Sequence, residues 1–145
     1  MPSLTDVAHL AAREQHFAVI STRRADGTIQ SSVVNAGILA HPPSGEEVLA
    51  FVTYGPVKLA NLRRRPQVSA TFRSGWEWLT VEGTAQLLGP HDLSDDLDAE
   101  GVRRLLRDIF VAAGGTHDDW PSYDRTMIAQ GRTAVLVSPS RIYGN

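Results

Sequence analysis

The sequence predicts a single α+β domain built on an antiparallel sheet or a small barrel. About six apolar, β-rich segments follow one another, most of them joined by short turns, and helical segments lie near the two ends. Strands joined by hairpins pair antiparallel, whereas parallel strands need a long crossover between them. No repeat, linker or shift in composition divides the chain, so we expect one domain spanning residues 1–145.

The chain begins with the pattern of a short amphipathic helix followed by a hairpin. Ser3 and Asp6 have the spacing of a capping box, and the apolar residues after Ser3 repeat with a helical period. A β-branched run over 17–22 is then separated by an Asp-Gly pair from a second β-rich run over 28–39. This arrangement predicts a β-hairpin.

A third strand and a short helix follow the hairpin. The loop 41–45 is rich in Pro and Gly and precedes an apolar strand at 48–53. A Gly-Pro pair then breaks the chain, and the stretch 57–65 reads as a helix that ends before Pro66.

The middle of the chain predicts a second hairpin. Residues 68–73 alternate between apolar and polar, a Ser-Gly turn follows, and a long β-rich run extends over 76–88. Within this run Trp76 and Trp78 are two residues apart, which places both indoles on one face of a strand. That face could bind an aromatic cofactor, form a dimer contact or be half-buried in the sheet.

The last third of the sequence holds two helices and a final strand. Apolar residues over 102–113 step at helical spacing and form the clearest helix of the chain. Asp119 is placed to cap a second helix with a Pro in its first turn. The final strand covers 134–137, and the segment 141–143 is a candidate extension beyond an intervening Pro.

Composition narrows the functional class. The 14 basic and 16 acidic residues give a net charge of −2, which lacks the basic excess typical of nucleic-acid binding. The absence of cysteine excludes disulfides, thiolate zinc sites and thiol nucleophiles. Charged residues interrupt the apolar positions near the N-terminus, which argues against a signal peptide or a membrane span. We therefore expect a cytoplasmic protein with neither nucleic-acid nor membrane partners.

None of the common hydrolase, nucleotide-binding or metalloprotease motifs is present. The five histidines are scattered, and only His117 stands next to other potential metal ligands, in the sequence His-Asp-Asp. An Asp that precedes a helix is most often a cap, so we expect no metal site.

The short helix at 57–65 is a candidate anion site. Free backbone N–H groups at a helix start and a lysine in its first turn, Lys58, attract negative charge. Asn61 and Arg65 can share a face with Lys58. The alternative is a solvated basic helix end in which the arginines complement the helix dipole, and the pattern alone leaves both readings open.

Five blocks of the sequence, taken together, resemble a known family. They are the segments 58–66, 75–76, 81–85, 119–128 and 138–144. In this order and spacing they are similar to the flavin/deazaflavin oxidoreductases of the pyridoxamine 5'-phosphate oxidase-like split β-barrel superfamily, and within it to the B group that uses the deazaflavin coenzyme F420. The resemblance implies a mainly β, six-stranded antiparallel split barrel with flanking helices, which forms a homodimer with two cofactor sites at the subunit interface.

The resemblance also implies which residues bind the cofactor. Lys58 and Asn61 match the residues that hold its phosphate-bearing side chain, with Arg63 or Arg64 nearby. Family members often carry an arginine two residues before the lysine, and here Pro56 stands in that place. This departure bears on the strength of phosphate binding and on the choice between F420 and FMN.

Two further groups of residues follow from the same matching. The ring of the cofactor would lie along the strand segment formed by Ser31, Ser32, Val33 and Val34. The second subunit would close the site near Trp76, Trp78 and Tyr143, and Tyr143 is also a candidate proton donor.

The implied activity is hydride transfer from F420 to an electron-poor conjugated small molecule, such as an enone, a quinone or a tetrapyrrole. The cofactor carries the reactive carbon, so the protein need supply only binding, orientation and exclusion of water. The alternatives are an FMN-binding oxidoreductase of the same superfamily and a non-enzymatic carrier of a cofactor or haem. Oxidation of a pyridoxamine-type phosphate ester is disfavoured, because Arg141 stands alone near the C-terminus.

Overall fold

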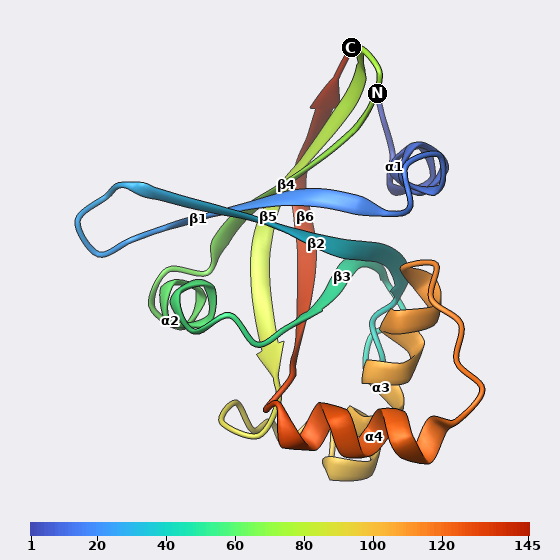
Figure 1. Ribbon diagram of the computed structural model, residues 1–145. Coiled ribbons are helices and arrows are strands. Elements are labelled where there is room, and N and C mark those ends of the chain that lie inside the picture. The colour runs from blue at the N-terminus through green and yellow to red at the C-terminus, as the bar shows by residue number, and fades with distance from the viewer.

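A computed structural model describes residues 1–145 as a six-stranded β-barrel with four helices packed around it (Figure 1). The strands are β1 (Phe17–Arg23), β2 (Ile29–Ala40), β3 (Glu47–Thr53), β4 (Gln67–Ser74), β5 (Glu77–Leu88) and β6 (Thr133–Gly144). The helices are α1 (Leu4–Ala12), α2 (Pro56–Arg64), α3 (Ala99–Ala112) and α4 (Trp120–Ala129). The predicted six-stranded antiparallel barrel with flanking helices is confirmed.

The barrel closes in the strand order β1-β2-β3-β6-β5-β4, with β4 pairing back onto β1, and every pair is antiparallel. Strand β6 covers both the predicted strand 134–137 and its candidate extension at 141–143, because it runs without a break past Pro139 and pairs with both β3 and β5. The ladder between β5 and β6 shifts register between Glu82 and Gly83. A side chain at Gly83 would collide with the carbonyl oxygen of Ser138, so this crossing requires glycine.

A first hydrophobic core fills the barrel and the space beneath α1 and α2. The inward-facing residues of the six strands alternate with outward-facing ones, as strand geometry requires. The largest completely buried side chains of this core are Val7, Ile20, Leu49, Phe51, Leu62, Phe72, Val81 and Val135.

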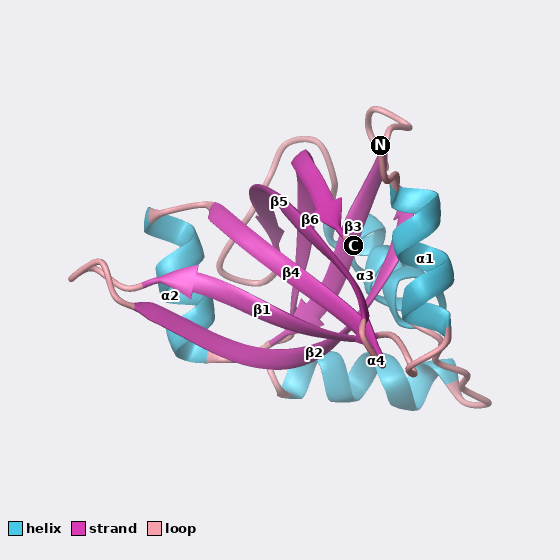
Figure 2. Cartoon of the chain, turned by 90° about the horizontal axis from the view of Figure 1, so that it is seen from above, coloured by secondary structure: helices cyan, strands magenta, loops and turns pink.

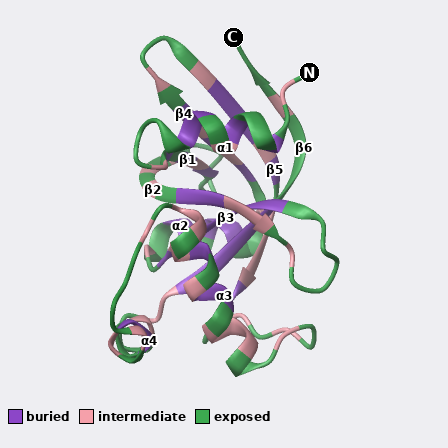
Figure 3. Cartoon of the chain, turned by 90° about the vertical axis from the view of Figure 1, so that its right-hand side faces the viewer, coloured by how far each residue is buried: buried purple, intermediate pink, exposed green.

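A second hydrophobic core lies outside the barrel, between β3, β5, β6 and the helices α3 and α4. Val48 and Ala50 of β3 point toward this core, whereas Leu49 and Phe51 of the same strand point into the barrel. Strand β3 is therefore buried on both faces (Figure 3). This second core fixes α3 and α4 against the barrel.

The four helices surround the barrel without covering all of it. Viewed from above, α2 lies at one end and α1, α3 and α4 lie toward the other, while one face of the β1–β2 hairpin carries no helix (Figure 2). The C-terminal end of α3 approaches β2 so closely that a Cβ at Gly37 would meet the backbone of Ala112. None of the four helices combines the length and apolar character needed to cross a membrane.

Candidate functional site

A cleft of about 520 Å³ opens between the middle of β2, the segment that joins β3 to α2, and the facing sides of α3 and α4. Val33 and Val34 of β2 form one wall, and Ile109 and Phe110 of α3 form the opposite one. The two valines are neighbours on β2 and so leave the strand on opposite faces: Val34 packs against the barrel core, and Val33 is 62% exposed.

The charged residues that line this cleft are all cations. Its lining contains two cations, Lys58 and Arg132, and no aspartate or glutamate. Neither cation forms a salt bridge with any carboxylate of the chain. Apolar walls with two unpaired cations are suited to a flat molecule that carries negative charge.

Lys58 is the buried cation of the cleft, with 5% of its surface exposed. Its Nζ donates one hydrogen bond, to Thr53 Oγ1 at 3.1 Å, and lies 5.7 Å from the centre of the Phe51 ring. Burial lowers the pKa of Lys58 below its usual value, and no neighbouring carboxylate opposes this effect. A buried ammonium with unused donors favours an anion as its partner.

The first turn of α2 adds backbone donors beside Lys58. Gly55 is the N-cap and Pro56 opens the helix, and no side chain caps this end. The backbone N–H groups of Val57 and Lys58 therefore have no acceptor within the chain. The partial positive charge of the helix N-terminus and the Lys58 ammonium act together at this place.

Sequence reasoning missed two residues of the cleft, Tyr54 and Arg132. The guanidinium carbon of Arg132 lies 3.8 Å from the centre of the Tyr54 ring, in a cation–π stack. The two residues are far apart in sequence, and only the pairing of β3 with β6 brings them together. The sequence shows a tyrosine shortly before Lys58, but no local pattern indicates that Arg132 stacks on it.

The other predicted phosphate ligands lie outside the cleft. Asn61 is buried beside Lys58 on α2, yet its Nδ2 donates to Thr22 Oγ1 of β1 at 3.0 Å. Arg63 forms a bidentate ion pair with Asp92, at 2.9 and 2.7 Å, and Arg64 is exposed. Lys58 is thus the one predicted phosphate ligand that the structure brings into the cleft.

The predicted ring-binding segment of β2 is divided between two faces. Val33 and Val34 line the cleft. Ser31 faces outward, where its hydroxyl hydrogen-bonds with Ser21 at 2.9 Å. Ser32 pairs with Ile20 of the barrel interior, and its buried hydroxyl has no partner. Ser32 does not line the cleft, and an ordered water would satisfy its hydroxyl.

The predicted aromatic face at Trp76 and Trp78 is wrong. Trp76 lies in the turn before β5 and is 93% exposed, so it is not on the same strand face as Trp78. Trp78 packs edge-on against Tyr143, with ring centres 6.1 Å apart. The Tyr143 hydroxyl donates to Glu82, which raises the pKa of that tyrosine. All three aromatics lie away from the cleft of their own chain.

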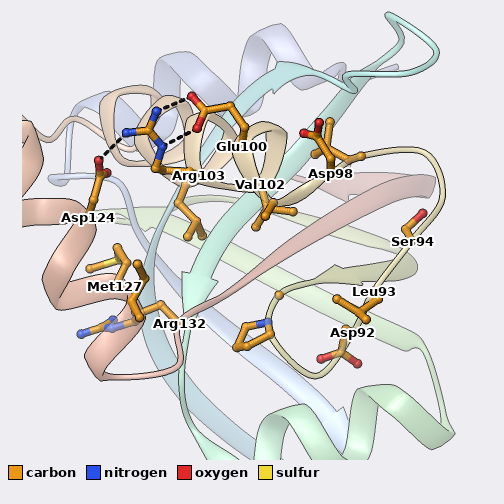
Figure 4. A pocket seen from close by; sticks show the side chains of 16 residues that line it. Asp92, Leu93, Ser94, Asp98, Glu100, Val102, Arg103, Asp124, Met127 and Arg132 are labelled. Atoms are coloured by element: carbon orange, nitrogen blue, oxygen red, sulfur yellow. Dashed lines mark hydrogen bonds and ion pairs between the residues drawn. The ribbon is translucent and has the colours of Figure 1, made fainter.

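A second cleft, of about 390 Å³, lies between the β5–α3 loop, α3 and α4 (Figure 4). Its lining is mostly apolar, and its acidic residues are satisfied within the chain. Arg103 binds both Glu100 and Asp124, while Asp98 caps α3 through the Gly101 N–H. Arg107 also binds Asp124, and these hydrogen bonds hold the pKa of Asp124 below its usual range. Its only cation without a salt bridge is Arg132, which also lines the first cleft, so the first cleft, called the α2 cleft below, is the better candidate site.

The donors at the start of α2, beside the cleft, fit a phosphate-bearing cofactor. An unpaired ammonium, two free backbone N–H groups and an acid-free lining are what a phosphate requires. The apolar walls on either side fit the flat ring system of a flavin or deazaflavin.

The fold and this cleft together define a split-barrel protein with an unpaired lysine at an uncapped helix N-terminus. A sequence profile of the family described as pyridoxamine 5'-phosphate oxidase matches residues 4–144. The chain therefore belongs to the pyridoxamine 5'-phosphate oxidase family.

Several solved structures share this fold. A conserved hypothetical protein, Rv2991 from Mycobacterium tuberculosis, is 18% identical with a TM-score of 0.69, over 99% of this chain and 84% of that one. A protein described as an F420 reductase is 17% identical with a TM-score of 0.57, over 89% and 90% of the two chains. A pyridoxamine 5'-phosphate oxidase-related, FMN-binding protein from Nostoc punctiforme is 13% identical with a TM-score of 0.63, over 98% and 83%. At these identities the likeness establishes the fold alone.

Proposed function

We propose that this protein is an F420-dependent oxidoreductase that transfers a hydride to an electron-poor conjugated small molecule. The observation that carries this proposal is the buried, carboxylate-free Lys58 at the start of α2, in a cleft with apolar walls and no acidic residue. The family membership and the fold shared with an F420 reductase support it.

The residues of the chain would act on the cofactor by binding and orientation. Lys58 and the N–H groups of Val57 and Lys58 would hold its phosphate. Val33 and Phe110 would hold the ring between them and keep water away from it. The bound deazaflavin would itself supply the hydride, which accounts for the lack of a catalytic motif in the sequence.

The phosphate site favours F420 over FMN. One buried ammonium and a helix N-terminus balance a single negative charge better than two. The phosphate of F420 is a diester with one charge, whereas a phosphate monoester such as that of FMN carries about −1.5 to −2 at pH 7. Pro56, which stands where related proteins often carry arginine, removes a second cation from this site.

The cleft itself contains no good proton donor for the substrate. Burial raises the pKa of Tyr123 to about 12, and its hydroxyl donates to the Leu106 carbonyl oxygen at 2.8 Å. Tyr54 is 52% exposed, and its ring supports Arg132. A proton would therefore come from solvent or from a second subunit. Tyr143 of a second subunit could serve only after its hydrogen bond to Glu82, which raises its pKa, is broken.

We further propose that a second copy of the chain covers the outer face of the β1–β2 hairpin. Phe17, Val19 and Val33 point outward there and are 48%, 43% and 62% exposed. Val33 also lines the α2 cleft, so a subunit packed on this face would close the cofactor site. Trp76 and Trp78 would then help to close the cofactor site of the partner subunit rather than the site of their own chain.

Anaerobic titration of the purified protein with F420, FMN and haemin, each followed by fluorescence or absorbance, tests this proposal. We expect saturable binding of F420, and turnover of reduced F420 when enones or quinones are added. Binding of FMN with turnover, and no binding or turnover with F420, would show that the cofactor is FMN. Tight binding of any of the three without consumption of a substrate would identify a carrier instead of an enzyme.

A further inference from the structure

Arg132 is held in place by uncharged neighbours, at the junction of α4 and β6. Its guanidinium stacks on Tyr54, and its Nε donates to Gln130 Oε1 at 2.8 Å. The two terminal nitrogens form no hydrogen bond within the chain. The planar group is thus fixed by stacking while four of its N–H donors stay available.

The arginines around Arg132 are used differently. Arg103 and Arg107 both bind Asp124, and Arg63 binds Asp92. Arg132 has no carboxylate, although it lies in the same corner of the molecule. Figure 4 shows its guanidinium turned away from Val102 and Leu93, which line the second cleft, so its stem forms a wall there. The charged end belongs to the α2 cleft, where Tyr54 also lies.

Arg132 and Lys58 reach the α2 cleft from different elements and at different depths. Lys58 starts from the first turn of α2 and is 5% exposed. Arg132 rests on Tyr54, which is 52% exposed, and so lies nearer the mouth of the cleft. One small anion at the bottom would satisfy Lys58 without occupying the donors of Arg132.

We propose that Arg132, positioned by Tyr54, is a second anion-binding residue, and that the cleft takes a ligand set with a second anionic group at its mouth. The group is a carboxylate or phosphate, for which a planar guanidinium offers paired donors. It could belong to the tail of the cofactor, because F420 carries carboxylates beyond its phosphate, or to the substrate. The inference rests on the proposed function. It gives the site a second cation, Arg132, where related proteins often carry an arginine at the position of Pro56.

The two sources are separated by binding measurements on Arg132→Gln, with Arg125→Gln as the control. Arg125 is an exposed arginine on α4 with no ion pair, so both variants lose one charge from the same region. If the cofactor tail supplies the anionic group, Arg132→Gln should weaken the binding of F420 about tenfold. The same variant should bind a deazaflavin that lacks both the phosphate and the tail as tightly as the wild type does.

If the substrate supplies the anionic group, Arg132→Gln should bind F420 and the shortened deazaflavin as tightly as the wild type does. Arg132→Gln then weakens binding of 3-benzoylacrylate about tenfold, but not of its uncharged methyl ester. Tyr54→Leu should reproduce either loss in part, whereas Tyr54→Phe, which retains the ring, should not. Equal affinities of Arg132→Gln and Arg125→Gln for all four ligands would overturn the proposal.

A readout without any cofactor keeps this test independent of the proposed function. The Nε–H resonance of Arg132 in ¹⁵N-labelled protein should shift on titration with pyrophosphate, and Tyr54→Leu should reduce the shift. If the wild type binds neither F420 nor FMN while this resonance still responds, the cofactor assignment fails and the anion site stands. An unresponsive Arg132 in a protein that binds F420 would contradict the anion site alone.

Discussion

Lys58 Nζ and Thr53 Oγ1 are 3.1 Å apart, and this is the only hydrogen bond of an ammonium that is almost completely buried. The Thr53 hydroxyl also accepts the Gly55 N–H at 3.3 Å, which fixes the turn into α2. The relationship positions a charge whose desolvation is not offset by any carboxylate of the chain. Lys58 therefore lowers stability without a ligand and should raise it with one.

Replacing Lys58 with methionine should separate stability from binding. We expect Lys58→Met to weaken F420 by about 10- to 100-fold, because a charge-assisted contact with phosphate contributes about 1.5–3 kcal/mol. The ligand-free variant should melt at a higher temperature than the wild type, since it no longer buries a charge. Calorimetry and thermal unfolding measure the two effects. A variant that binds F420 as the wild type does would show that Lys58 is not the phosphate ligand.

The lowered pKa of Lys58 predicts a pH dependence. Above that lowered pKa the folded protein binds fewer protons at Lys58 than the unfolded chain does, so the ligand-free protein gains stability as the pH rises toward 10.5. Phosphate binding needs the protonated form, so cofactor affinity should fall over the same interval. Lys58→Arg stays charged there and is the matched control. A wild-type affinity that is flat up to pH 10.5 would contradict this assignment.

Gly37 should be required for the placement of α3. A Cβ at this position would collide with the backbone of Ala112, so Gly37→Ala must push the C-terminal end of α3 away from β2. We expect a loss of about 1–3 kcal/mol in the free energy of unfolding and weaker cofactor binding, because α3 forms a wall of the cleft. Gly27→Ala in the β1–β2 turn meets no neighbouring atom and should destabilise the fold without weakening cofactor binding.

The outward face of the β1–β2 hairpin should tolerate no charge if a second copy covers it. Val19→Asp would place a carboxylate beside Val33 in that contact. We expect this variant to sediment as a monomer where the wild type sediments as a dimer. Val111→Asp, at a 54% exposed position on α3, should leave the dimer intact. A wild-type monomer at micromolar concentration would remove the basis of the shared site.

Local patterns in the sequence predict much of the fold. Ser3 and Asp6 form both hydrogen bonds of the predicted capping box, and Asp119 caps α4 as its position indicated. Trp76 was placed wrongly because a β-rich run does not show where a two-residue turn ends. Barrel closure depends on pairings between distant segments, which the family resemblance supplied and periodicity did not. The extension of β6 over 141–143 was a candidate from the sequence, and its pairing with β5 confirms it.

The candidate site is predictable only in part for the same reason. Lys58 was identifiable because helix-start chemistry is local. The pairing of Asn61 with Thr22 and of Arg63 with Asp92 joins residues far apart in the chain, so neither could be read from spacing. Arg132 reaches Tyr54 only through the barrel, and no short motif contains both residues.

The burial of β3 on both faces sets the timescales on which the two sides of the α2 cleft can open. Amides of β3 and of the first half of β6 lie between two cores, so their hydrogen exchange should require global unfolding. The β1–β2 hairpin is covered on one face only, and its end near Gly27 should exchange through small local openings. A flat cofactor would then enter beside the rigid strand β3 while the β1–β2 hairpin opens locally. Its binding should therefore slow amide hydrogen exchange in β2 far more than in β3.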